Sequence, residues 1–121
     1  MMKGKILVIE DNEQNLYLLS FLLKKHDYEV HQARDGRTGI ELASQLTPDL
    51  ILLDIQLPGM DGYAVAHLLR QNEQLQNVPI VAVTSYAMVG DREQAIAAGC
   101  AGYIEKPINP DTFMGQVEAY L

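Results

Sequence analysis

The chain has 121 residues, 48% of them hydrophobic, which is enough for one domain with a buried core and too few for two. Its formal net charge of −7 excludes a general binder of nucleic acids or acidic membranes, because such a protein needs a basic face. No hydrophobic run approaches the about 18 residues that cross a bilayer, and the N-terminal residues lack the features of a signal peptide.

Strands and helices are predicted to alternate along the first half of the chain. Residues 5–10 (KILVIE) contain a continuous run of Ile, Leu and Val, which is typical of a parallel strand covered on both faces. The helix that follows has Asp11 or Asn12 as its cap. Residues 28–33 (YEVHQA) alternate in polarity, so we expect this strand at a sheet edge, and residues 35–46 form the next helix. The residues predicted to line the inner faces of these helices are Leu16, Leu19, Leu23, Ile40, Ala43 and Leu46.

The same alternation continues in the second half. Residues 50–54 (LILLD) and 80–84 (IVAVT) predict two further buried strands, and a helix that begins at Asp61 lies between them. Residues 91–99 (DREQAIAAG) predict a short, weakly hydrophobic helix that its last glycine ends. Residues 102–106 (GYIEK) are the fifth strand. The hydrophobic residues carried by the helix after Asp61 are Val65, Leu68 and Leu69.

A last helix completes five strand–helix repeats. Asn109 is its predicted cap, and Pro110 takes the first helical position, where its missing N–H is not needed. Its predicted inward-facing residues are Phe113, Val117 and Tyr120. Right-handed crossovers then give a doubly wound α/β fold, in which a five-stranded parallel sheet carries helices on both faces. In such sheets the functional site lies beyond the carboxyl ends of the strands.

Polar residues stand at four of these strand ends. Glu10 and Asp11 end the first strand, Asp54 the third, Thr84 the fourth and Lys106 the fifth. With the strand order 2-1-3-4-5, the first and third strands are neighbours, so the three carboxylates share one pocket. Thr84 and Lys106 then flank this pocket on its far side.

This set of groups fits phosphoryl transfer. Three carboxylates repel one another unless a cation is present, and hard oxygen ligands suit Mg²⁺. Lys106 and Mg²⁺ together balance the three negative charges and can stabilise an incoming phosphoryl group. Asp54 is the candidate nucleophile, and Thr84 can donate a hydrogen bond to a phosphoryl oxygen. The alternative, that Asp11, Asp54 and Asp61 only cap helices or turns, accounts for each aspartate singly but not for the set.

Four segments resemble the receiver domain of two-component response regulators, over essentially the whole chain. They are ILVIEDN, PDLILLDIQLPGMDG, IVAVTSYAM and GYIEKPI. The resemblance implies a flavodoxin-like (βα)5 fold, with residues 1–121 as one receiver domain and no output domain. It implies a signalling switch rather than an enzyme, which accepts a phosphoryl group on Asp54 from the phosphohistidine of a histidine kinase or histidine phosphotransferase.

The resemblance also assigns roles around the pocket. It implies that Asp11, Asp54 and the main-chain carbonyl of Gln56 bind Mg²⁺, and that Glu10, longer than the aspartate often found there, acts mainly through water. It implies a cis peptide bond between Lys106 and Pro107, which is compatible with the local energetics of an X-Pro bond.

Further roles concern the lifetime and the readout of the phosphoryl state. The resemblance implies that Gln56 and Tyr86 influence the lifetime, and we expect a moderately long-lived phosphoryl group. It implies that Thr84 moves toward this group and that Tyr103 turns from exposed to buried. The expected output face is the fourth helix, the fifth strand and the fifth helix, through which a downstream protein partner is bound. Whether phosphorylation drives dimerisation is left open by the sequence.

The start of the first helix lies beside the predicted pocket. Asn12, Gln14, Asn15 and Leu16 are therefore a plausible docking surface for a helix of the phosphodonor, although an ordinary amphipathic helix accounts for them almost as well.

Cysteine and histidine are expected to have structural roles. Cys100 is the only cysteine, which excludes an internal disulfide bond, fits a reducing cytoplasm and is typical of a small buried residue. His26, His31 and His67 lack the spacing of metal ligands.

Three other functions compete with the receiver interpretation. A phosphatase of the haloacid-dehalogenase type needs a second acid two residues after the nucleophile, and Gln56 stands there. A flavodoxin-type cofactor carrier needs phosphate-binding donors after the first strand, where residues 10–12 (EDN) would repel a phosphate. A receiver that signals without phosphorylation would not need the complete set of Asp54, Thr84 and Lys106.

Overall fold

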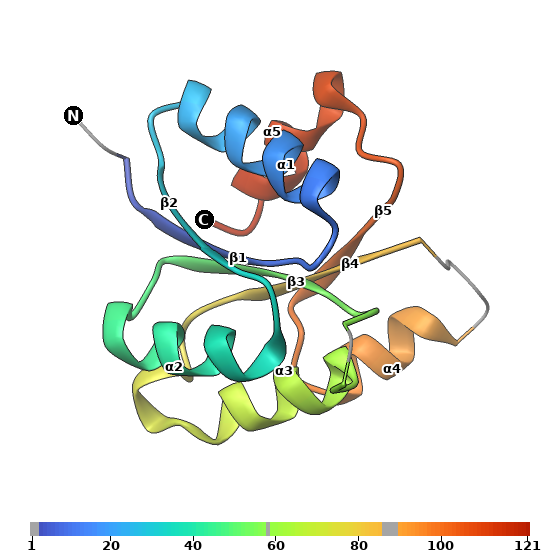
Figure 1. The fold of residues 1–121 in the computed structure, drawn as a ribbon. Coiled ribbons are helices and arrows are strands. Elements are labelled where there is room, and N and C mark those ends of the chain that lie inside the picture. The colour runs from blue at the N-terminus through green and yellow to red at the C-terminus, as the bar shows by residue number, and fades with distance from the viewer. Residues whose placement is uncertain (1–2, 58, 86–89) are drawn as a thin grey trace.

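The computed structural model describes residues 3–57, 59–85 and 90–121 and has five parallel strands in the order β2-β1-β3-β4-β5, as predicted (Figure 1). The strands are β1 (Lys5–Ile9), β2 (Glu29–Ala33), β3 (Leu50–Asp54), β4 (Ile80–Thr84) and β5 (Gly102–Glu105). The helices are α1 (Glu13–Lys25), α2 (Gly36–Leu46), α3 (Gly62–Gln71), α4 (Asp91–Ala97) and α5 (Pro110–Glu118), with a short 3-10 helix η1 (Glu73–Leu75). Within the described ranges, none of these helices has the length and hydrophobicity needed to cross a membrane.

Helices cover both faces of the sheet. α1 and α5 lie on one face, and α2, α3 and α4 lie on the other (Figure 1). Successive residues of a strand point to opposite faces, so Ile6 and Val8 belong to the core under α1 and α5, while Leu7 and Ile9 belong to the core under α2 and α3. Strands β3 and β4 are buried at every position, whereas the edge strand β2 is mostly half-buried. The edge position predicted for the second strand is confirmed.

The predicted helix caps are present. Asn12, Asp61 and Asn109 each accept a hydrogen bond from a backbone N–H two or three residues further on, at 2.9 to 3.1 Å. Pro110 takes the first position of α5, where no intrahelical donor is lost. Asn12 rather than Asp11 caps α1, and this leaves the Asp11 carboxylate available to the acidic pocket.

Helix α3 turns a different stripe to the sheet than its leucines alone indicate. Val65, Ala66 and Leu69 are completely buried, but Leu68 is 42% exposed. Because successive residues of a helix lie about 100° apart, the stripe through positions 65, 66 and 69 leaves position 68 at the flank. The small Ala66 allows the helix to approach the sheet along this stripe.

Strands β1 and β5 each end one residue earlier than predicted. β1 ends at Ile9 and β5 at Glu105, so Glu10 and Lys106 lie in the loops just beyond the sheet. Backbone pairing with the neighbouring strand decides where a strand ends, and residue type does not specify this pairing. These two polar residues therefore lie at the rim of the sheet and not in its ladder.

Candidate functional site

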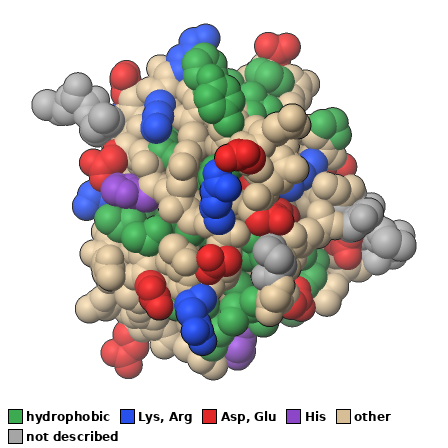
Figure 2. Space-filling model, in the orientation of Figure 1, with side chains coloured by type: hydrophobic (Ala, Val, Ile, Leu, Met, Phe, Trp, Pro, Cys, Tyr) green, Lys and Arg blue, Asp and Glu red, His purple; other side chains and the backbone are tan. Residues whose placement is uncertain are grey.

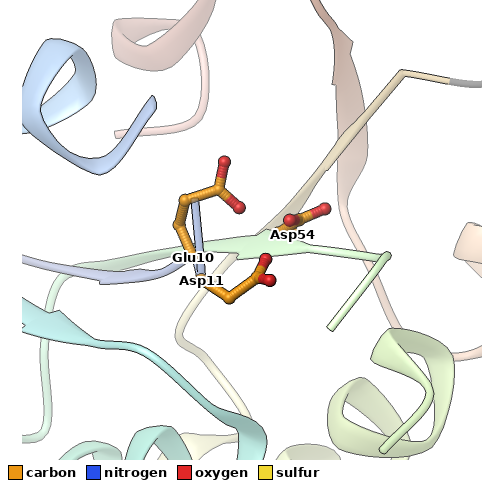
Figure 3. A group of neighbouring side chains, drawn as sticks. All are labelled: Glu10, Asp11 and Asp54. Atoms are coloured by element: carbon orange, nitrogen blue, oxygen red, sulfur yellow. The ribbon is translucent and has the colours of Figure 1, made fainter. Parts of the chain in front are cut away.

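Three carboxylates meet at the carboxyl edge of the sheet. Glu10, Asp11 and Asp54 each offer an oxygen that lies within 4.8 Å of the other two. Glu10 and Asp11 follow β1, and Asp54 is the last residue of its direct neighbour β3 (Figure 3). Glu10 and Asp54 are 1% and 3% exposed, whereas Asp11 is exposed, so the pocket has a buried floor and an open side at Asp11.

Lys106 reaches these carboxylates from the end of the edge strand β5. Its Nζ donates a hydrogen bond to Oε1 of Glu10 at 2.8 Å and lies 3.4 Å from Oδ2 of Asp54. The Lys106 side chain is only 9% exposed. The peptide bond between Lys106 and Pro107 is cis, as the resemblance implied. Lys106 thus lies beside Asp54 as expected, but its closest carboxylate is that of Glu10.

Asp54 is held in place by the loop that follows it. Its Oδ1 accepts a hydrogen bond from the backbone N–H of Gln56 at 2.9 Å. The Gln56 side chain is exposed. The sequence pointed to the carbonyl of Gln56, and the structure adds the amide, which no residue pattern specifies because any non-proline residue supplies an N–H.

Glu10 has a raised pKa, and one of its buried carboxylate oxygens has no hydrogen-bond partner. Burial, and then the neighbouring Asp54 carboxylate, raise the pKa of Glu10 to about 7, although Lys106 opposes the shift. Oε2 of Glu10 is the one buried side-chain oxygen or nitrogen within the described residues that has no hydrogen-bond partner. An unsatisfied buried carboxylate oxygen beside two more carboxylates is the environment that a divalent cation stabilises.

Thr84 and Tyr103 occupy the positions expected of them in the sheet. Thr84 ends β4, is 5% exposed, and accepts the backbone N–H of Lys106 on its carbonyl at 2.7 Å. Tyr103 is half-buried on β5 and packs against the core on the α2–α3 side. Tyr86 lies outside the described residues.

Only part of the docking surface predicted at the start of α1 is exposed to solvent. Asn12 and Gln14 are exposed, but Leu16 is 3% exposed and belongs to the core. Hydrophobic side chains do reach the surface over α1 (Figure 2), and Tyr17 and Phe21 stack there with 6.3 Å between their ring centroids. The helical repeat explains the difference, because position 16 lies one turn from the buried Leu19 and Ser20 while positions 17 and 21 face solvent.

The cysteine and the histidines lie outside the pocket. Cys100 is buried, as predicted. His26, the C-cap of α1, contacts Leu22 of that helix, and His31 and His67 each contact a residue of their own strand or helix region. In the part of the chain that the structure describes, Glu10, Asp11 and Asp54 form the one group of three or more potential ligands close enough to hold a metal ion.

The strand order and the acidic pocket are those of a flavodoxin-like, CheY-like receiver domain. The pocket holds a buried aspartate, two further acids and a lysine at the carboxyl edge of the sheet. The sequence model of the response regulator receiver domain family matches residues 6–118, so the chain belongs to this family. Proteins of the family serve phosphorylation-dependent signalling in two-component systems. The polar-differentiation response regulator DivK of Brucella ovis is 40% identical over 120 residues, which cover 99% of this chain and 98% of the relative. DivK of Brucella anthropi is 39% identical over the same shares.

Solved structures agree with this assignment. The chemotaxis protein CheY4 of Vibrio cholerae superposes with a TM-score of 0.94 at 28% identity, and the superposition covers all of both chains. The receiver domain of a sensor histidine kinase from Pseudomonas aeruginosa gives a TM-score of 0.89 at 32% identity, over 97% of this chain and 96% of that one. That structure contains a magnesium ion coordinated in its active site cleft.

Proposed function

We propose that the protein is a phosphorylation-activated switch in which Asp54 accepts a phosphoryl group from the phosphohistidine of a histidine kinase or histidine phosphotransferase. A carboxylate oxygen of Asp54 attacks the phosphorus, the P–N bond to histidine breaks, and the imidazole leaves with the bonding electron pair. The observation that carries the proposal is the setting of Asp54, which is buried at a strand end between Lys106 and the Gln56 amide.

The residues present fit Mg²⁺. Glu10, Asp11, Asp54 and the carbonyl of Gln56 are the groups that would hold it, and the unsatisfied oxygen of Glu10 supports a cation here. When bound, Mg²⁺ supplies positive charge beside the phosphoryl oxygens as the transition state forms. The magnesium ion in the Pseudomonas relative supports the same assignment.

The remaining roles concern the phosphoryl group once it is on Asp54. Lys106 provides an ammonium charge and Thr84 a hydroxyl, each as a contact for a phosphoryl oxygen. Gln56 and Tyr86 stand at the positions that influence access of water to the acyl phosphate, and we expect a moderately long-lived group. Its decay can be followed by intact mass after acetyl phosphate is removed, and a half-life of a few seconds contradicts this expectation.

The switch is proposed to act through α4, β5 and α5. Movement of Thr84 lets Tyr103 turn inward, which changes this face of the domain. A cavity of about 380 Å³ beside Tyr103, lined also by Arg92 of α4 and Gln116 of α5, supports this output face. Helix α4 buries little hydrophobic surface: the small Ala95 is its buried residue, and Ile96 is 52% exposed. A coupling of about 1–3 kcal/mol is enough to shift the population severalfold to a hundredfold.

In the cell, residues 1–121 are proposed to act as one receiver domain in the cytoplasm. The protein would then pass its signal by phosphoryl relay or by binding a downstream protein, and it is a switch and not an enzyme. Phosphorylation-dependent dimerisation is one form that this output can take.

The test is phosphorylation by acetyl phosphate with Mg²⁺, followed by intact mass spectrometry. The wild type should gain one phosphoryl group, and Asp54→Asn should gain none. Asp61→Asn is the matched control, because this aspartate lies in the same segment but caps α3, a role that asparagine also fills. Absence of an adduct on the wild type, or an adduct on Asp54→Asn, overturns the proposal.

A further inference from the structure

The pairing of Lys106 with Glu10 joins residues that are far apart in the sheet. Glu10 follows β1 and Lys106 follows β5, and β3 and β4 lie between these strands. The backbone N–H of Lys106 donates a hydrogen bond to the carbonyl of Thr84 at 2.7 Å, so its side chain starts beside the end of β4. The side chain extends from there to Glu10, which follows β1. Asp54 lies closer in the strand order, because β3 is the direct neighbour of β4.

The distances show which carboxylate holds the lysine. Nζ of Lys106 is 2.8 Å from Glu10 Oε1, which is a charge-assisted hydrogen bond, and 3.4 Å from Asp54 Oδ2, which is only a close ion pair. Both carboxylates are almost completely buried, so the interaction with each is little weakened by solvent. The ammonium group therefore contacts the two carboxylates unequally, and its shorter contact is with Glu10.

We infer that Glu10 is a positioning residue, which takes the hydrogen bond of the Lys106 ammonium and leaves Asp54 with the longer ion-pair contact in the unphosphorylated protein. The inference rests on the proposed function, since it concerns the oxygen that would attack phosphorus. An ammonium hydrogen-bonded to Asp54 would occupy a lone pair of that oxygen and lower its nucleophilicity. With Lys106 on Glu10, the lysine stays within reach of an arriving phosphoryl oxygen and leaves Asp54 Oδ2 less engaged.

The length of the Glu10 side chain is part of this inference. Aspartate at this position has the same charge but is one methylene shorter, so its carboxylate would be drawn back from Lys106 toward β1. The lysine would then move to Asp54, the other carboxylate within reach. Glu10→Asp separates a role of reach from a role of charge, because only reach is lost.

The test uses the unfolding equilibrium of the full chain in EDTA, so it requires neither a cation nor phosphorylation. Double-mutant cycles of Glu10→Gln with Lys106→Met, and of Asp54→Asn with Lys106→Met, measure the two couplings. We expect the Glu10–Lys106 coupling to change the unfolding constant about tenfold or more, and the Asp54–Lys106 coupling to change it less than about threefold. In the Glu10→Gln background, the Asp54–Lys106 coupling should rise. Equal couplings, or a larger one for Asp54, overturn the inference.

A spectroscopic signature separates positioning from a general effect on stability. The chain has five lysines, and the ammonium resonance of Lys106 can be assigned as the one that Lys106→Met removes in a lysine-selective ¹H–¹⁵N spectrum. This resonance should shift in Glu10→Asp and in Glu10→Gln alike, while Asp61→Asn, the matched control at a helix cap outside the pocket, leaves it nearly unchanged. A wild-type-like resonance in Glu10→Asp overturns the inference. Failure of the proposed function is separate, since it appears as a missing phosphoryl adduct on the wild type.

Discussion

At the scale of single residues, burial decides what Cys100 can do. The thiol is 5% exposed, and burial raises its pKa to about 11, although Arg70 opposes the shift. Only the thiolate is nucleophilic, so about one thiol in a thousand is reactive at pH 8, roughly a hundredfold fewer than at an ordinary pKa. We predict that iodoacetamide modifies the native protein at least about a hundredfold more slowly than the protein in denaturant, as followed by intact mass.

The same shift predicts a pH dependence. Because the pKa lies above the working range, the native rate should rise about tenfold for each pH unit between 8 and 10. A denatured sample should instead level off near the ordinary pKa of about 8.5. Equal rates in native and denatured protein, or a native rate that levels off near pH 9, would contradict the burial of Cys100.

Single residues also show where prediction from the sequence ended. Asp54, Asp11 and Thr84 could be placed at one rim because the carboxyl ends of parallel strands meet there. The pairing of Glu10 with Lys106 was not predicted, because it depends on side-chain lengths measured across two intervening strands. The one signal in the sequence for this pairing is the glutamate itself, whose side chain is longer than that of aspartate.

At the scale of helices and strands, two glycines on helices give opposite predictions for one substitution. A Cβ at Gly62, the first residue of α3, would meet the backbone of Ile55, with the carbonyl oxygen only 2.7 Å away. A Cβ at Gly115, on the exposed side of α5, meets nothing within 4 Å. Backbone atoms cannot move aside as a flexible side chain can, so the clash at Gly62 outweighs the gain in helix propensity.

We therefore predict that Gly62→Ala lowers the free energy of unfolding by about 2 kcal/mol or more, while Gly115→Ala raises it by about 0.5–1 kcal/mol. Denaturant unfolding of both variants beside the wild type measures the two changes. A stabilised Gly62→Ala would mean that α3 does not start against the Ile55 backbone.

Arg70 connects three elements that the sequence pattern did not join. Its guanidinium donates hydrogen bonds to the carbonyl of Gly99, just after α4, and to that of Leu75, at the end of η1, each at 2.8 Å. Removing the donor leaves two carbonyls without this partner, so Arg70→Met should lower the free energy of unfolding by about 1–3 kcal/mol. Arg37→Met, at an exposed position of α2, is the control and should change it by less than about 0.5 kcal/mol. Equal effects of the two variants in thermal or denaturant unfolding would show that these hydrogen bonds add nothing.

Element by element, the sequence predicted what depends on local chemistry. Strand identity, the caps at Asn12, Asp61 and Asn109, and the edge position of β2 all follow from residue type and spacing. The exposure of Leu68 and the contacts of Arg70 depend on how neighbouring elements approach one another. That approach is fixed by packing, which a periodic pattern does not contain.

At the scale of the whole molecule, the acidic pocket connects cation binding to the stability of the fold. The chain carries a formal net charge of −7, and three of its carboxylates share one pocket in which Lys106 is the close cation. Their mutual repulsion opposes folding when no divalent cation is present, because unfolding lets the carboxylates separate and regain water. A cation that binds only the folded state stabilises it by mass action.

We predict that Mg²⁺ raises the free energy of unfolding by about 2.7 kcal/mol at a concentration one hundred times its dissociation constant, and that EDTA reverses the gain. Denaturant unfolding at a series of Mg²⁺ concentrations measures this, with NaCl at matched ionic strength as the control for general screening of the net charge. Asp11→Asn should lose most of the gain, whereas Asp61→Asn should keep it, because only Asp11 lies in the pocket. An equal rise with NaCl, or an undiminished rise in Asp11→Asn, would place the stabilising cation elsewhere on the molecule and remove this support for a magnesium site beside Asp54.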